Sequence, residues 1–234
     1  MISVDELIRI NSKDFDSWIV SINNFLDYRY SENELQTNKL WEVTSSCVNS
    51  LSKIAELCIR FGNYKDNWDY NNFYQHLYGP ELIIKSSKTS CEFKIGLDNK
   101  GIYLSTDFRY NENLRYMGDE FWKLLLSLYE FDGFIYEEFE FVNDTRRKQF
   151  PELFSTNKSM VFRILRKYIF DSTETDNRYV SSSVGELKIQ WPSDTDFEEI
   201  IRNCCLGFKV MYQLNYSLWK VTDLKTRKTF ANKG

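Results

Sequence analysis

The sequence predicts an α+β fold with N-terminal helices, a mainly antiparallel sheet of about four to five strands, and a long C-terminal helix. The first eighty residues carry apolar side chains at helical spacing. Residues 82–108 instead hold three short strand-like segments, and in the second Phe93, Ile95 and Leu97 alternate with Lys94 and Gly96 as in a strand. A second long helical pattern begins at Pro192. This order lacks the regular alternation of a βαβ fold.

The N-terminal part, residues 1–80, is expected to be helical. Ser3 and Glu6 form a capping-box pattern at the first helix. Leu40, Cys47 and Cys58 mark one buried face further along. The expected helices are one that begins after Ser3, one that begins after Asp14, one over residues 32–60, and a short one over residues 66–78.

The remainder, residues 81–234, is expected to be an α+β part that joins the N-terminal helices in one compact domain. The expected strands cover residues 82–84, 91–97, 101–108, 133–142 and 184–191. The expected helices cover residues 118–130, 160–170 and 192–220, with Ser193 or Asp194 as the last N-cap and a frayed basic tail over 223–234. The polar stretch 171–183 is the best candidate for a linker.

The net charge and the cysteine content limit the classes of protein to which this chain can belong. The formal net charge is −4, which disfavours general binding to a nucleic acid backbone. Five cysteines, an odd number without a CxxC pair, indicate reduced, buried thiols and a cytoplasmic location. The chain shows neither a signal-peptide pattern nor an apolar run long enough to span a bilayer, so no membrane association is expected. Abundant Asn, Lys, Ile, Tyr and Phe suggest an AT-rich genome, such as that of a bacterium or phage.

Reactive groups are scarce. His76 is the single histidine, so multi-histidine metal sites and most histidine-based catalytic dyads are excluded. The nucleotide-binding glycine-rich loops and the GxSxG hydrolase motif are absent. We therefore expect no cofactor and no resident metal, and we lean against an enzyme.

One pattern could carry chemistry. Glu186-x-Lys188 on an expected strand is followed by Gln213 and Tyr216 on the long helix. This order resembles the RecB-like nucleases of the PD-(D/E)xK type, over residues 171–220. The resemblance implies Mg²⁺ held by Asp176 and Glu186, with Lys188 polarising the scissile phosphate. Gln and Tyr are three residues apart here where the family has four, and Asp176 lies in the polar linker.

An acidic–aromatic segment, residues 129–140, is the alternative candidate. Rings supply buried area at a protein interface, and carboxylates steer association with a basic partner. On the strand, Ile135 and Glu137 are expected to share the face that is mostly core, whereas the other face is mixed. The candidate partner-binding residues are Glu130, Asp132, Phe134, Tyr136, Glu138 and Glu140.

A basic row on the helix over residues 160–170 is a candidate anion site. Arg163, Arg166 and Lys167 share one helical face by their spacing. The same pattern also arises on a solvated helix face whose basic side chains bind nothing.

Three functional hypotheses follow from these patterns. The first is a non-enzymatic protein of the inhibitor, immunity or antitoxin type that occludes a basic protein partner through the acidic–aromatic surface. The second is a Mg²⁺-dependent nuclease that uses Asp176, Glu186 and Lys188. The third is a structural subunit of a larger complex.

Overall fold

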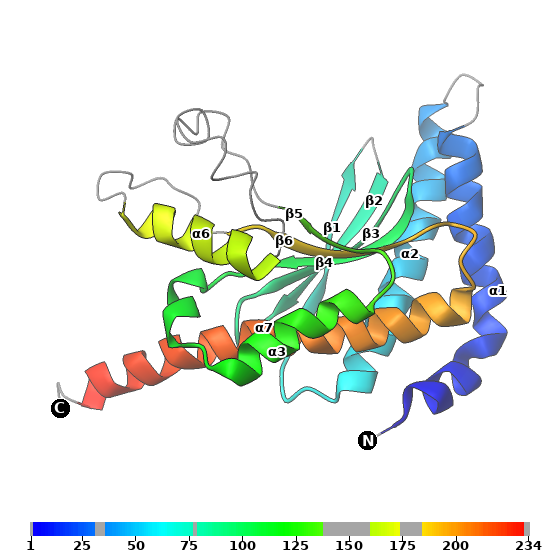
Figure 1. The fold of residues 1–234 in the computed structure, drawn as a ribbon. Helices are drawn as coiled ribbons and strands as arrows, with labels where there is room; N and C mark the ends of the chain where they lie inside the picture. The colour runs from blue at the N-terminus through cyan, green and yellow to red at the C-terminus, as the bar shows by residue number, and fades with distance from the viewer. Residues whose placement is uncertain (1, 31–35, 77–78, 138–159, 174–183, 232–234) are drawn as a thin grey trace, which may run out of the picture.

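The computed structural model describes residues 2–30, 36–76, 79–137, 160–173 and 184–231. It has a six-stranded sheet with a layer of helices, and the predicted α+β class is confirmed (Figure 1). The helices are α1 (Val4–Arg29), α2 (Thr37–Gly62), η1 (Asn111–Tyr116), α3 (Asp119–Leu126), η2 (Ser127–Glu130), α6 (Met160–Thr173) and α7 (Phe197–Ala231). The strands are β1 (Trp68–His76), β2 (Gly79–Ser86), β3 (Glu92–Asp98), β4 (Gly101–Asp107), β5 (Phe134–Glu137) and β6 (Glu186–Trp191).

The sheet has the strand order β1-β2-β3-β4-β6-β5, and each neighbouring pair is antiparallel. The first four strands follow one another along the chain, whereas β6 lies between β4 and β5. Leu104 of β4 and Ile189 of β6 face Gly207 of α7, so α7 covers one face of the sheet, called here the inner face. Opposite ends of the chain therefore build the sheet and its cover.

Helices α1 and α2 form an antiparallel pair beside the sheet (Figure 1). The side chain of Ser3 accepts a hydrogen bond from the backbone N–H of Glu6, which confirms the predicted cap. A single helix replaces the two that were expected before residue 30. Asn11 and Ser12 bond back to the carbonyls of Leu7 and Arg9 within the helix, so these polar residues do not interrupt it.

Residues 66–78 were expected to be a helix, and this prediction is wrong. Trp68–His76 is the edge strand β1, paired with β2 from Trp68 opposite Ser86 to His76 opposite Gly79. The aromatic residues of this segment have high strand propensity, and pairing with β2 fixes the segment as a strand. The N-terminal helical part thus ends near residue 63, not 80.

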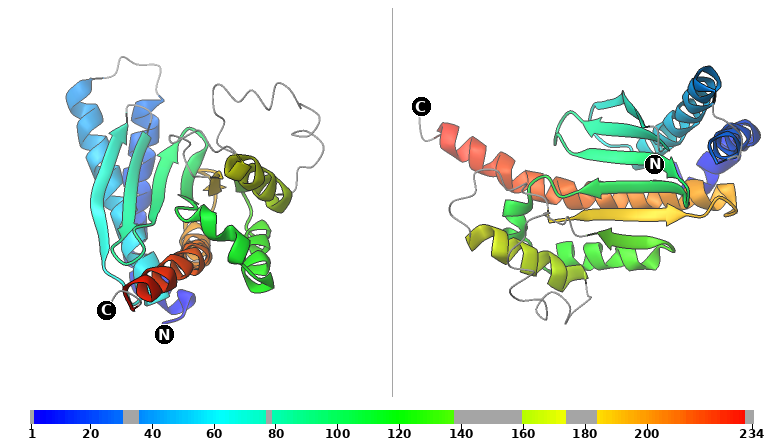
Figure 2. Two further views of the ribbon diagram at one scale, coloured as in Figure 1. Left: turned by 90° about the vertical axis from the view of Figure 1, so that its left-hand side faces the viewer. Right: turned by 90° about the horizontal axis from the view of Figure 1, so that it is seen from above.

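The long helix α7 starts and ends later than predicted. The side chain of Asp196, and not that of Ser193 or Asp194, caps it by accepting from the backbone N–H of Glu199 at 3.1 Å. At the other end the helix continues through the expected frayed tail to Ala231 (Figure 2). Fully buried Asn113 of η1 donates to the carbonyl of Leu218, which fixes the helix where it leaves the sheet. Of the predicted linker, residues 171–173 belong to α6, and residues 174–183 lie outside the described residues.

The five cysteines are buried and unpaired, as the sequence predicted. Cys58 of α2 lies with its Sγ atom 3.6 Å from that of Cys204 on α7, in the core between these two helices. No helix in the described part of the chain combines the length and the apolar character needed to cross a bilayer.

Candidate functional site

Strand β5 carries the acidic–aromatic segment, and its two faces are the reverse of the prediction. Ile135 and Glu137 point outward and are exposed, whereas Tyr136 is buried and Phe134 is half-buried. The register explains this, because Phe134 pairs with Ile189 and Tyr136 pairs with Leu187, both of which face the helices. Glu138 and Glu140 lie outside the described residues.

The inward rings are held by specific contacts. The Tyr136 hydroxyl donates a hydrogen bond to the carbonyl of Val184, and the Phe134 ring meets that of Tyr129 edge-on, with centroids 5.4 Å apart. Neither ring is free to serve as an anchor for a partner. The exposed ring and aliphatic side chain of the segment are instead those of Tyr129 and Ile135.

The exposed side chains around β5 are apolar and acidic. Tyr129 of η2 is 54% exposed and Leu126, one helical turn earlier, is 48% exposed. Both predicted acids before the strand, Glu130 and Asp132, are also exposed. We call this set the edge surface; its members are Leu126, Tyr129, Glu130, Asp132, Ile135 and Glu137.

The sheet face opposite α7, called here the outer face, continues the edge surface with charged side chains in rows. Alternation along each strand turns these residues away from the helices. Pairing places Glu137 opposite Glu186, and Glu186 opposite Asp107. Glu92 of β3 extends the row beyond Asp107, because Phe93 and Thr106 are paired next to it. We call these four carboxylates the acid row. Like charges directly across strands repel, so the row needs compensating cations.

Lysines and hydroxyls supply part of that compensation. Lys94 lies 3.6 Å from the Oε1 atom of Glu186, which also accepts a hydrogen bond from Ser105. Lys85 contacts Glu92 at 2.9 Å. At the turn end of the face, Asp98 accepts from Gln190 and pairs with Lys188, whose ammonium lies over the ring of Tyr103. The outer face is thus an ordered polar network with a surplus of acids.

Asp107 is the member of the acid row whose negative charge is least favourable in the folded protein. Burial raises its pKa above that of an ordinary aspartate; Lys94 lowers it, and the neighbouring Glu186 and Glu92 raise it further. A carboxyl that holds its proton more tightly in the folded chain than in the unfolded chain destabilises the fold once it ionises. The penalty is absent below the unfolded pKa, grows as the pH rises toward the folded pKa, and is complete above it.

Asp107→Asn is therefore expected to raise the free energy of unfolding at about pH 7 and to change it less at about pH 4. Urea unfolding at the two pH values measures the difference. Asp16→Asn, on the exposed side of α1, is the control and should change little at either pH. If Asp107→Asn lowered the free energy of unfolding at neutral pH, the ionised Asp107 carboxylate would not be destabilising as we infer.

The residues of the nuclease-like pattern are not brought together. Glu186 and Lys188 point to the outer face, whereas α7, which carries Gln213 and Tyr216, packs on the inner face. The side chain of Gln213 is exposed, and the ring of Tyr216 stacks on that of Tyr212 at 5.9 Å. Asp176 lies outside the described residues. The resemblance therefore rests on sequence order without a shared site among the four residues that the structure describes.

Of the three side chains of the predicted anion site, the structure describes only that of Arg163. Its guanidinium lies over the Tyr136 ring, 4.7 Å from the centroid, and donates to the carbonyl of Tyr136 at 3.2 Å. This arginine fastens α6 to β5. The side chains of Arg166 and Lys167 lie outside the described residues, as does that of His76.

Among the residues that the structure describes, no three histidine, cysteine, aspartate or glutamate side chains converge to hold a metal ion. Sequence reasoning missed Leu126, Asp98 and Asp107 as members of a surface. Alternation in residues 92–107 could have identified the two aspartates as outward-facing, but their neighbours across β6 required the register. Comparison with protein-family models, with curated proteins and with solved structures finds no match to this chain.

Proposed function

We propose that this protein is a non-enzymatic protein-binding protein, of the inhibitor, immunity or antitoxin type, that occludes a basic partner with its edge surface and acid row. The observation that carries the proposal is the juxtaposition of exposed apolar side chains with exposed carboxylates around β5. Tyr129 and Ile135 expose 54% and 38% of their surface, and three acids of the same short segment are exposed with them. Such a surface combines buried area with steering charge.

Charge balance supports a basic partner. The outer face of the described strands carries seven carboxylates, Asp69, Glu81, Glu92, Asp98, Asp107, Glu137 and Glu186, and Glu130 and Asp132 add two. Three lysines, Lys85, Lys94 and Lys188, lie on the same face, so nine negative and three positive charges leave −6. The whole chain has a net charge of −4. This surface is therefore strongly acidic and would attract and orient a positively charged partner.

Affinity capture from the native host tests the proposal. A protein of positive net charge is expected to co-purify in stoichiometric amount with the wild-type chain. The triple charge reversal Glu130→Lys, Asp132→Lys and Glu137→Lys should weaken this binding at least about tenfold, because attraction becomes repulsion at the rim.

The matched control reverses three exposed acids on α1 and α2, with Asp14→Lys, Asp16→Lys and Glu42→Lys. It makes the same change in net charge and should retain the partner. Retention by the edge-surface variant, or equal loss in both variants, would contradict docking at this surface. A stable assembly with several subunits and no basic member would favour the structural-subunit hypothesis instead.

A further inference from the structure

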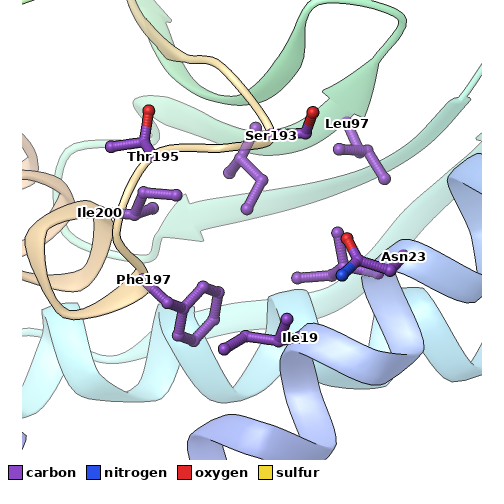
Figure 3. Close-up of a pocket in the computed structure, with 9 residues that line it drawn as sticks. Ile19, Asn23, Leu97, Ser193, Thr195, Phe197 and Ile200 are labelled. Carbon is purple, nitrogen blue, oxygen red and sulfur yellow. The ribbon is translucent and has the colours of Figure 1, made fainter.

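A small cavity lies where α1, the β3–β4 hairpin and the beginning of α7 meet. Its volume is about 80 Å³. Figure 3 shows its lining side chains converging from these three parts of the chain around a common space. The apolar part of the wall consists of Ile19, Ile22, Leu97, Ile102, Phe197 and Ile200. All of these except Ile19 are buried, so the cavity reaches into the core.

The mouth of the cavity is polar and uncharged. Asn23 of α1 and Ser193 and Thr195 of the loop before α7 complete the lining (Figure 3). Asn23 and Ser193 are exposed and Thr195 is half-buried, which places them toward solvent. Their side chains make no hydrogen bond to any other residue in the described part of the chain. The amide and the two hydroxyls at the mouth are thus not engaged within the described part of the chain.

The volume and the lining of the cavity determine which class of ligand it can hold. A cavity of about 80 Å³ is far smaller than the roughly 300–1,000 Å³ pockets that hold cofactors and drug-sized ligands. The apolar part of its wall offers water no hydrogen-bonding partner, and an apolar cavity of about 150 Å³ is known to bind small apolar guests. A charged guest would lose its hydration without an ionic partner in the lining.

We propose that this cavity is a binding site for a small neutral molecule of about four to six non-hydrogen atoms, with a branched aliphatic body and one hydroxyl or amide group. The aliphatic body packs between Ile22, Ile102 and Ile200, and the polar group reaches Thr195 or Asn23 at the mouth. The site involves none of the edge-surface residues and is independent of the proposed partner binding.

Titration with 2-methylpropan-1-ol, followed by NMR of isoleucine and leucine methyl groups, tests the site. Saturable shifts are expected at the methyls of Ile22, Leu97, Ile102 and Ile200, with a dissociation constant in roughly the millimolar range, as suits so few atoms. The carboxylate of the same skeleton, 2-methylpropanoate, should give no saturable shift at the same concentrations. The absence of saturable shifts with the alcohol, or equal shifts with the carboxylate, would overturn the proposal.

Two variants separate the site from general solvent effects. Ile19→Phe fills the cavity and should abolish the shifts, whereas Val20→Phe, at a neighbouring position that is 57% exposed, should leave them unchanged. Thr195→Val removes one hydroxyl at nearly constant shape and should weaken alcohol binding several-fold while leaving xenon binding in place. Undiminished alcohol shifts in a folded Ile19→Phe protein would overturn the proposal. Xenon probes the apolar part of the cavity alone. If Ile19→Phe does not fold, the proposal is tested by Thr195→Val, and it would be overturned if that variant bound the alcohol with unchanged affinity but no longer bound xenon.

Discussion

Phe208→Ala is expected to lower the free energy of unfolding by about 3–5 kcal/mol, the cost of removing a buried phenylalanine side chain and leaving a cavity. Phe208 of α7 is fully buried, and its ring centroid lies 4.7 Å from that of Phe93 and 5.5 Å from that of Trp68. It joins α7 to β3 and to the beginning of β1. Few other single side chains tie the C-terminal helix so directly to the first half of the sheet.

Urea unfolding followed by circular dichroism measures this effect, and the melting temperature should fall by roughly 6–20 °C for a chain of this size. Trp41→Ala is the control, because Trp41 on α2 is 56% exposed and its truncation should cost about 1 kcal/mol or less. A loss below about 1 kcal/mol for Phe208→Ala would show that α7 does not pack on the sheet as described.

Gly101→Ala is expected to destabilise the protein by about 2–4 kcal/mol, through backbone strain and a direct clash. Gly101 begins β4 with a φ of +122°, which side chains rarely adopt. An added methyl carbon would lie 2.0 Å from the carbonyl oxygen of Trp191 and 3.0 Å from the Cα atom of Pro192. Because both obstacles are backbone atoms, β6 would have to move away from β4, and the outer face would lose its register.

The comparison is Gly118→Ala, at a glycine with ordinary φ and no atom within 4 Å of the added carbon. Gly118 is the N-cap of α3, where alanine is less favourable than glycine, so that substitution should lower the free energy of unfolding by about 0.5–1 kcal/mol. The difference between the two losses in free energy of unfolding measures the strain and clash at Gly101, separate from the general effect of replacing glycine with alanine. Equal stabilities for the two would mean that the hairpin does not approach β6 as the structure shows.

Elements with one dominant local signal could be predicted from the sequence. The β3–β4 hairpin follows from alternation around Asp98, whose side chain accepts from the backbone N–H of Lys100 at 2.8 Å and closes the turn. The first N-cap at Ser3 follows from its spacing to Glu6. In both, residues close in sequence supply the interactions that decide the structure.

Elements decided by distant partners were misjudged. β1 is a strand because β2 is beside it, and a local aromatic pattern cannot contain that information. α7 continues past Lys220 because Lys225 contacts Asn113 of η1, more than a hundred residues earlier in the chain. The chemical character of the terminal segment had instead suggested fraying.

The candidate site shows the same division. Exposure of Glu130 and Asp132 was anticipated, since acids next to a turn are usually solvated. The outward side of β5 was predicted incorrectly, because a strand with apolar residues on both sides is oriented only by its neighbour, and that neighbour, β6, lies some fifty residues later in the chain. The acid row is a property of register, and no single strand reveals it.

In the proposed complex, a basic partner covers the edge surface and the acid row. Hydrogen exchange of the protein, free and in complex with the captured partner, tests it most directly. Backbone amides of η2, β5 and β6 are expected to exchange more slowly in the complex, and the protection should weaken as salt is raised. Protection confined to α1 and α2, with no change in β5 and β6, would contradict the claim.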